Sequence, residues 1–169
     1  MSIVNIIDFI KLFGDLPKYV NQYGYKSPTP LSCSVNIGIS NDLNGEILPD
    51  SLPGELIELW NLSSEIRLFE DKTYGQWGLI IVSPDRSIDL TNFAQSNRQD
   101  QFKKTDLVIG EFLGDLDQIV ISRDIDDFGA IHIALPLDTR NDWPLVGNSL
   151  SDFLTKFINT SGEKYWEGR

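Results

Sequence analysis

The chain contains one histidine and one cysteine, two side-chain types that often serve as catalytic base and nucleophile. His132 stands between two isoleucines in an expected strand, where a single histidine is usually a packed or solvated side chain. Cys33 has no basic neighbour or helix start that would activate it, so the role of a small, buried apolar residue fits it better. A catalytic Cys33–His132 pair stays an open alternative, because such partners need not be close in sequence.

Aspartates are the other residues that could do chemistry. Asp115 with Asp117, or Asp126 with Asp127, could act as acid and base in a hydrolase. Both pairs lie in expected turns, and an aspartate in a turn usually bonds to the local backbone and faces water. A carboxylate-based hydrolase is therefore the weaker alternative.

Motifs for nucleotides, metals and acyl-enzymes are absent from the sequence. It contains no Walker loop, dinucleotide glycine fingerprint, His-Glu-x-x-His pair or Gly-x-Ser-x-Gly elbow. Residues 124–135 resemble a calcium loop only in part, because Phe128 and Leu135 stand where oxygen ligands are needed. A single cysteine provides neither an internal disulfide nor the cysteine pair of a zinc site. We therefore expect no cofactor, no bound metal and no enzymatic activity.

The net charge is −11, from 25 acidic and 14 basic residues, and it is unevenly distributed. Residues 41–71 carry −7 and residues 111–129 carry −5, so the rest of the chain is nearly neutral. Such a surface repels nucleic acid and anionic membranes and attracts a basic protein. Two interpretations stay open: two separate solvated loops, or one contiguous acidic surface that steers a basic partner.

The second interpretation predicts which residues touch the partner. They are the aspartates of the second acidic segment and a tryptophan within a polar stretch: Asp115, Asp117, Asp124, Asp126, Asp127 and Trp143. Carboxylates accept charge-assisted hydrogen bonds from Arg and Lys, and tryptophan is a frequent anchor in protein interfaces. Trp60 and Trp77 follow or precede apolar residues, and we expect them in the core.

The length of 169 residues corresponds to one domain, 1–169, that buries enough surface for a substantial core. The N-terminus lacks the basic leader of a signal peptide, and no apolar run could span a bilayer. Together with the single cysteine, these features predict a protein of the reducing cytoplasm.

Four helices are predicted from the spacing of apolar residues. The first covers residues 3–13, and the last follows Ser149, which forms a capping box with Asp152. The second begins near Pro53, placed in its first turn, and the third begins after Ser83. The expected apolar side of the third helix is formed by Ile88, Leu90 and Phe93.

Strands are predicted mainly in neighbouring pairs. The segments with strand patterns are residues 34–39, 65–69, 77–82, 107–113, 118–122 and 130–135. Pairs of strands, rather than strand–helix–strand repeats, favour an α+β domain whose central sheet is mostly antiparallel, with helices packed on it.

The element order and the residues at the junctions resemble the SUKH superfamily of SMI1/KNR4-like domains over residues 52–158. The resemblance rests on these motifs: Leu52-Pro53 with Leu56, Leu59 and Trp60; Trp77-Gly78 before Ser83-Pro84-Asp85; Ile109-Gly110-Glu111 through Asp117; Gly129-Ala130-Ile131; Trp143; and Phe153-Leu154. One departure is Leu62-Ser63-Ser64, where the family often has a glycine pair.

The resemblance implies a function in binding and transfers no catalytic residue. Many bacterial members are similar to immunity proteins that bind and neutralise a toxin, whereas fungal members resemble regulatory hubs. We therefore expect an immunity protein that covers the basic active-site face of a toxin. A regulatory or scaffold adaptor is the alternative.

Overall fold

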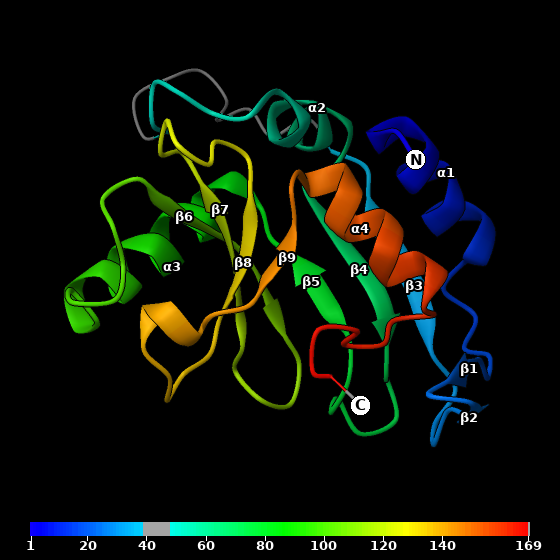
Figure 1. Ribbon diagram of the computed structural model, residues 1–169. Helices are drawn as coiled ribbons and strands as arrows, with labels where there is room; N and C mark the ends of the chain where they lie inside the picture. Colours follow the sequence, from blue (N-terminus) through cyan, green and yellow to red (C-terminus); the bar gives the residue numbers. More distant parts are fainter. Residues whose placement is uncertain (39–47, 169) are drawn as a thin grey trace.

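Seven strands form one antiparallel sheet with helices on both of its faces (Figure 1). The computed structural model describes residues 1–38 and 48–168. The strand order follows the sequence from β3 to β9, so the predicted α+β fold with an antiparallel sheet is confirmed. The helices and strands are α1 (Ile3–Phe13), β1 (Asn21–Gln22), β2 (Tyr25–Lys26), β3 (Ser32–Asn36), α2 (Gly54–Leu62), β4 (Glu65–Glu70), β5 (Leu79–Ile81), α3 (Pro84–Asn97), β6 (Asp106–Phe112), β7 (Gln118–Ser122), β8 (Ile131–Ala134), the 3-10 helix η1 (Arg140–Asp142), β9 (Leu145–Gly147) and α4 (Leu150–Asn159).

The sheet is buried on both sides. Helices α1, α2 and α4 supply the larger core on one face, and α3 covers β6 on the other (Figure 1). Because side chains alternate along a strand, Ile119 and Ile121 of β7 enter the larger core while Val120 points toward α3. Two covered faces explain why the central strands are almost continuously hydrophobic.

Aromatic rings fasten α4 to the sheet. The Phe157 ring lies 5.8 Å from that of Phe69 on β4 and 5.9 Å from that of Phe112 on β6, measured between centroids. Trp166, beyond the end of α4, lies 5.5 Å from the Phe112 ring and so holds the C-terminal segment against the sheet. Edge-on and tilted pairs of this kind each add about 0.5–1.5 kcal/mol beyond the burial of their area.

The predicted serine cap of the last helix is confirmed, and the first helix has a serine cap as well. Ser2 accepts a hydrogen bond from the Asn5 N–H at 3.2 Å and begins α1. Ser149 accepts one from the Asp152 N–H at 3.2 Å and begins α4. The Asp152 carboxylate in turn accepts from the Asn148 N–H at 3.0 Å, which completes a box-like cap.

Among the described residues, no helix is long and apolar enough to cross a membrane.

The predicted apolar side of α3 is wrong in part. Leu90 is buried, but Phe93 is 69% exposed, and two polar residues face the sheet instead. Ser87 donates its hydroxyl hydrogen bond to the Val108 carbonyl, and Thr91 accepts one from the Val108 N–H at 2.9 Å. These hydroxyls satisfy buried backbone groups of β6, a role that a hydropathy pattern does not reveal.

Several element boundaries also differ from expectation. Pro53 is the residue before α2 and makes no side-chain cap, so it lies one position earlier than predicted. The short strands β1, β2 and β9 lie outside the predicted strand segments, because two or three residues are too few to show alternation. The predicted strand 34–39 corresponds to β3, and its last residue lies outside the described part of the chain.

Replacing Gly147 with alanine should destabilise the fold by about 1–3 kcal/mol. A Cβ at this position would lie 2.8 Å from Cβ and 2.9 Å from the backbone N of Phe153, so β9 and α4 would have to separate. Gly54→Ala is the matched control, because its Cβ would meet nothing within 4 Å and alanine favours a helix. Urea unfolding of both variants measures the difference; equal midpoints would contradict the tight contact.

Candidate partner-binding surface

The predicted contact aspartates do not form one surface. Asp115 and Asp117 lie in the turn between β6 and β7, whereas Asp124, Asp126 and Asp127 lie in the turn between β7 and β8. Figure 1 shows these turns at opposite ends of β7. Five strand residues separate them, which corresponds to about 17 Å. A partner that contacts the β6–β7 turn at one end of β7 therefore does not contact the β7–β8 turn at the other end unless its own surface spans the length of the strand.

The carboxylates of the β6–β7 turn bind a buried lysine from the C-terminal segment. Lys164 donates a hydrogen bond to Asp117 Oδ2 at 2.8 Å and another to Asp115, and its ammonium lies 4.7 Å from the centroid of the Phe112 ring. Lys164 and Asp117 are both buried. Asp117 is thus an internal ion-pair partner in this structure, and Asp115, which is exposed, is partly neutralised by the same ammonium.

Burial and pairing act against each other in this cluster. Burial raises the pKa of the Asp117 carboxyl above its ordinary value, although the bond to Lys164 lowers it. For Lys164, burial lowers the pKa, but the two carboxylates more than compensate and hold it above its ordinary value. Lys164 therefore keeps its charge at neutral pH and ties the C-terminal segment to the β6–β7 turn.

The β7–β8 turn presents its carboxylates differently. Asp124 accepts a hydrogen bond from the Asp126 N–H at 3.3 Å and one from Lys103 Nζ at 3.2 Å, which shapes the turn. Asp126 is exposed and belongs to none of the ion pairs between described residues. Ile125 stands between these two aspartates and is 93% exposed. The tip of this turn is an apolar side chain flanked by carboxylates.

Asp127 is bonded to the only histidine. His132 Nε2 lies 3.1 Å from Asp127 Oδ2, and Ser122 donates its hydroxyl hydrogen bond to the other carboxylate oxygen. Burial raises the pKa of Asp127, but the bonds from Ser122 and His132 outweigh it and leave the pKa below its ordinary value. The serine bonds to the carboxylate and not to the imidazole, so the three do not form a serine–histidine relay.

Cys33 lies far from this cluster. Four strands separate β3, which carries Cys33, from β8, which carries His132. The thiol is buried and accepts a hydrogen bond from the Phe69 N–H at 3.3 Å. Burial raises the pKa of Cys33 to about 12, which leaves it protonated. The thiol–imidazole alternative is therefore not assembled in this fold.

Trp143 lies inside the smaller core and not on the surface. It is 6% exposed, and its ring lies 4.9 Å from the Phe102 ring between centroids. The Arg140 guanidinium lies 5.2 Å from the indole and binds the fully buried Asp106, with Nη2 to Oδ1 at 2.9 Å. Arg140, in the polar stretch before Trp143, thus forms an internal ion pair and stacks on the indole, so the predicted contact of Trp143 with a partner would require this packing to open.

The first acidic segment is used largely inside the molecule. Glu55 accepts hydrogen bonds from the backbone N–H of Ser151 at 2.8 Å and from its hydroxyl at 2.6 Å, and so holds α2 to α4. Arg67 is paired with Glu65 at 2.8 Å and with Glu70 at 2.7 Å. The acidic residues of this segment that stay exposed and carry no ion pair in the described structure are Asp50 and Glu58. Asp71 is buried, and Asp42 and Glu46 lie outside the described part of the chain.

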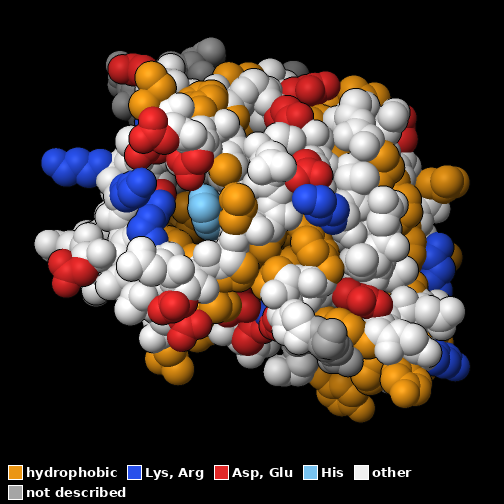
Figure 2. All heavy atoms as spheres, in the orientation of Figure 1, with side chains coloured by type: hydrophobic (Ala, Val, Ile, Leu, Met, Phe, Trp, Pro, Cys, Tyr) orange, Lys and Arg blue, Asp and Glu red, His pale blue; other side chains and the backbone are white. Residues whose placement is uncertain are grey.

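Among the described residues, the two acidic segments approach each other near Gly129 and Pro53. A Cβ on Gly129, at the end of the β7–β8 turn, would lie 4.0 Å from Pro53 at the start of α2. Figure 2 shows acidic side chains over this turn and over α2, along the upper part of the face in view. We call this edge the acidic rim and define it by its carboxylates: Asp50, Glu58, Asp124, Asp126 and Asp127.

Within the described residues, no three His, Cys, Asp or Glu side chains are placed to hold a metal ion.

The Lys164 cluster predicts a strong effect of one substitution. Lys164→Met should destabilise the protein by about 3–5 kcal/mol, because it leaves Asp117 buried without a cation. The pKa of Asp117 should rise further, so the deficit should be smallest below the carboxyl pKa of the unfolded chain, about 3.9, and grow as pH rises through the folded-state pKa. The double variant with Asp117→Asn should recover part of the loss. Denaturant unfolding between pH 3 and pH 7 measures both; a deficit that does not depend on pH would contradict the role of the unpaired carboxylate.

Comparisons with protein-family models, with curated proteins and with solved structures found no match to this chain. The resemblance to the SUKH superfamily therefore stays a prediction from the sequence motifs.

Proposed function

We propose that this chain is a binding protein that neutralises a basic partner, as an immunity protein does with a toxin. The observation that carries the proposal is the tip of the β7–β8 turn, where Ile125 is 93% exposed beside the unpaired carboxylate of Asp126. Some carboxylates elsewhere are engaged inside the molecule, for example Asp117 with Lys164, whereas others, such as Asp8 and Asp100, are exposed and belong to no ion pair between described residues. At the acidic rim, Asp50, Glu58 and Asp126 are exposed and belong to no ion pair between described residues, whereas Asp124 is paired with Lys103 and Asp127 with His132.

The chemistry of the rim suits a surface that binds nucleic acid. A nuclease or deaminase toxin presents Lys and Arg to phosphate groups, and carboxylates accept charge-assisted hydrogen bonds from both. Ile125 supplies an apolar contact with carboxylates on both sides. Protein interfaces commonly have this arrangement, an apolar centre surrounded by polar groups. Covering the basic face would exclude the toxin's substrate without any reaction by this chain, in the cytoplasmic location expected from the sequence.

The structure narrows the residues in the proposal. Asp124, Asp126 and Asp127 stay in the proposed contact set, together with Ile125. Asp117 and Trp143 do not contribute, because both side chains are buried by internal partners. Asp115 is exposed but lies at the other end of β7, beside the ammonium of Lys164.

Reversing the charge of Asp126 should slow association with the partner. The partner to be tested is a toxin domain, sought first among the products of neighbouring genes, and the measured quantity is its association rate at low and high salt. Asp126→Lys should reduce the rate by roughly three- to tenfold at low salt, with a smaller effect at high salt, because steering is screened. Ile125→Ala should instead speed dissociation.

Asp8→Lys is the matched control, because Asp8 is exposed on α1 and the charge change is the same. Equal association rates for the two charge reversals would assign the attraction to net charge alone and remove the rim from the proposal. Loss of protection against the toxin with Asp126→Lys, but not with Asp8→Lys, would support occlusion by the rim.

A further inference from the structure

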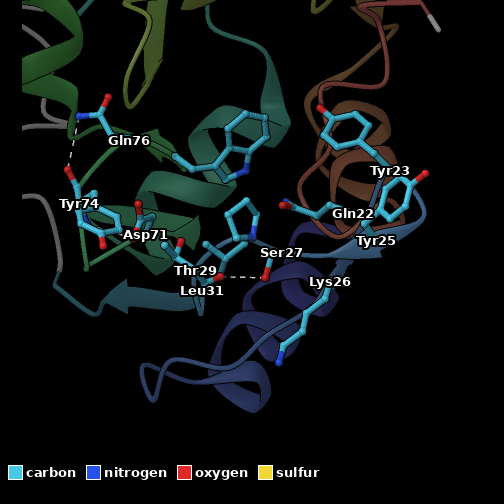
Figure 3. A pocket seen from close by; sticks show the side chains of 12 residues that line it. Gln22, Tyr23, Tyr25, Lys26, Ser27, Thr29, Leu31, Asp71, Tyr74 and Gln76 are labelled. Atoms are coloured by element: carbon cyan, nitrogen blue, oxygen red, sulfur yellow. Dashed lines mark hydrogen bonds between the residues drawn. The ribbon is translucent and has the colours of Figure 1, made fainter.

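A cavity of about 510 Å³ opens between the β1–β2 hairpin and the loop that joins β4 to β5 (Figure 3). It lies at the opposite end of the molecule from the acidic rim, close to the C-terminal segment (Figure 1). Aromatic side chains from both loops line it: Tyr23, Tyr25, Tyr74 and Trp77. Trp77 was expected in the core and is only half-buried. Cavities of this volume with aromatic walls are typical ligand sites.

Two of the aromatic rings stand free in solvent. Tyr25 is 77% exposed and Tyr74 is 72% exposed, and neither belongs to an aromatic pair among the described residues. Tyr23, in contrast, packs edge-on against Trp77 with centroids 6.4 Å apart. The cavity therefore has one fixed aromatic wall and two exposed rings at its sides, which a ligand could cover.

The polar side chains of the wall include both acceptors and donors, among them the buried Nε1–H of Trp77, which has no hydrogen-bond partner in the described structure. Gln22 is 7% exposed, donates its amide hydrogen bond to the Ser161 carbonyl at 2.8 Å, and directs its amide end toward the cavity (Figure 3). That bond uses the amide nitrogen, so the side-chain oxygen is the atom left to accept from a ligand. Lys26 also lines the cavity, but its side chain points away, with the ammonium 3.9 Å from the centroid of the Tyr19 ring (Figure 3).

Asp71 adds a negative charge to the wall. It is buried, and burial raises its pKa, but hydrogen bonds from the backbone N–H groups of Tyr74, Thr73 and Gln76 and from the Thr29 side chain outweigh this and hold the pKa below its ordinary value. The carboxylate is therefore ionised at neutral pH. Asp71 belongs to none of the ion pairs between the residues that the structure describes. A positive ligand group could balance this charge.

We propose that this cavity binds an organic cation, a guanidinium or alkylammonium group on an apolar stem. The faces of tyrosine and tryptophan rings attract such cations, and a planar guanidinium also stacks on them. Its N–H groups would donate to the Gln22 amide oxygen and face the charge of Asp71. The chain itself shows the same kind of contact, for example where Lys26 lies over Tyr19 and where Lys18 lies over Phe13 at 4.0 Å.

The source of the cation is either a free amine or an arginine side chain of another protein. Both share the chemistry that the cavity recognises, and the probes below distinguish them. The site is separate from the acidic rim, so either proposal can fail while the other stands.

The test titrates the full chain with agmatine, with an arginine-centred pentapeptide and with the neutral citrulline pentapeptide, and follows binding by calorimetry and by the NMR signals of Tyr25 and Tyr74. Agmatine and the arginine peptide should bind at least about tenfold more tightly than the citrulline peptide. Tighter binding of the arginine peptide than of agmatine would indicate a protein side chain as the source, and the reverse order would indicate a free amine.

Three variants of lining residues and one control locate the binding. Tyr25→Ala and Tyr74→Ala should each weaken agmatine binding by about five- to tenfold, and both side chains are exposed enough to leave the fold intact. Phe93→Ala removes an equally exposed ring from α3 and should have no effect. Asp71→Asn keeps an acceptor for the loop N–H groups and removes the charge. It should therefore weaken the binding of both agmatine and the arginine peptide. Equal binding of the citrulline peptide, unchanged affinity in the tyrosine variants, or no binding at about 10 mM would overturn the proposal.

Discussion

A sheet that is covered on both faces is the constraint on which the rest of this structure depends. The side chains of β7 alternate between two cores, so neither face of the central strands is free for a ligand. Function must then lie where the strands end. The acidic rim and the aromatic cavity both occupy such places, one at the β7–β8 turn and the other between the β1–β2 hairpin and the β4–β5 loop.

Internal ion pairs decide how much of the negative charge reaches the surface. Asp106 is fully buried and binds Arg140, Asp117 binds Lys164, and Glu55 caps α4 through Ser151. Removing one partner from such a buried pair is costly because it leaves an unpaired charge in a medium of low dielectric constant. The charge of −11 is therefore a poor guide to the surface field, which depends on the carboxylates left outside these pairs.

The C-terminal segment connects the parts of the molecule that carry the candidate cation site. Ser161 accepts a hydrogen bond from Gln22, and the Lys164 N–H donates to the Tyr23 hydroxyl at 2.9 Å. Lys164 also reaches the β6–β7 turn through its ammonium. The same short segment thus supports the β1–β2 hairpin and neutralises Asp117, which gives a reason for a buried lysine so close to the end of the described chain.

Local signals were sufficient for part of this architecture. The first and last helices were predictable because their caps and apolar spacing lie within a few residues, and the paired strands because alternation and turn residues favour antiparallel neighbours. The candidate site was predictable only as a list of carboxylates. Which of them are free, where Trp143 lies and how the aromatic cavity is assembled depend on contacts between residues far apart in sequence. Asp117 and Lys164, for example, are 47 positions apart. Charge and hydropathy are properties of single residues, whereas burial and pairing exist only once distant segments pack together, and so the tertiary structure alone decided them.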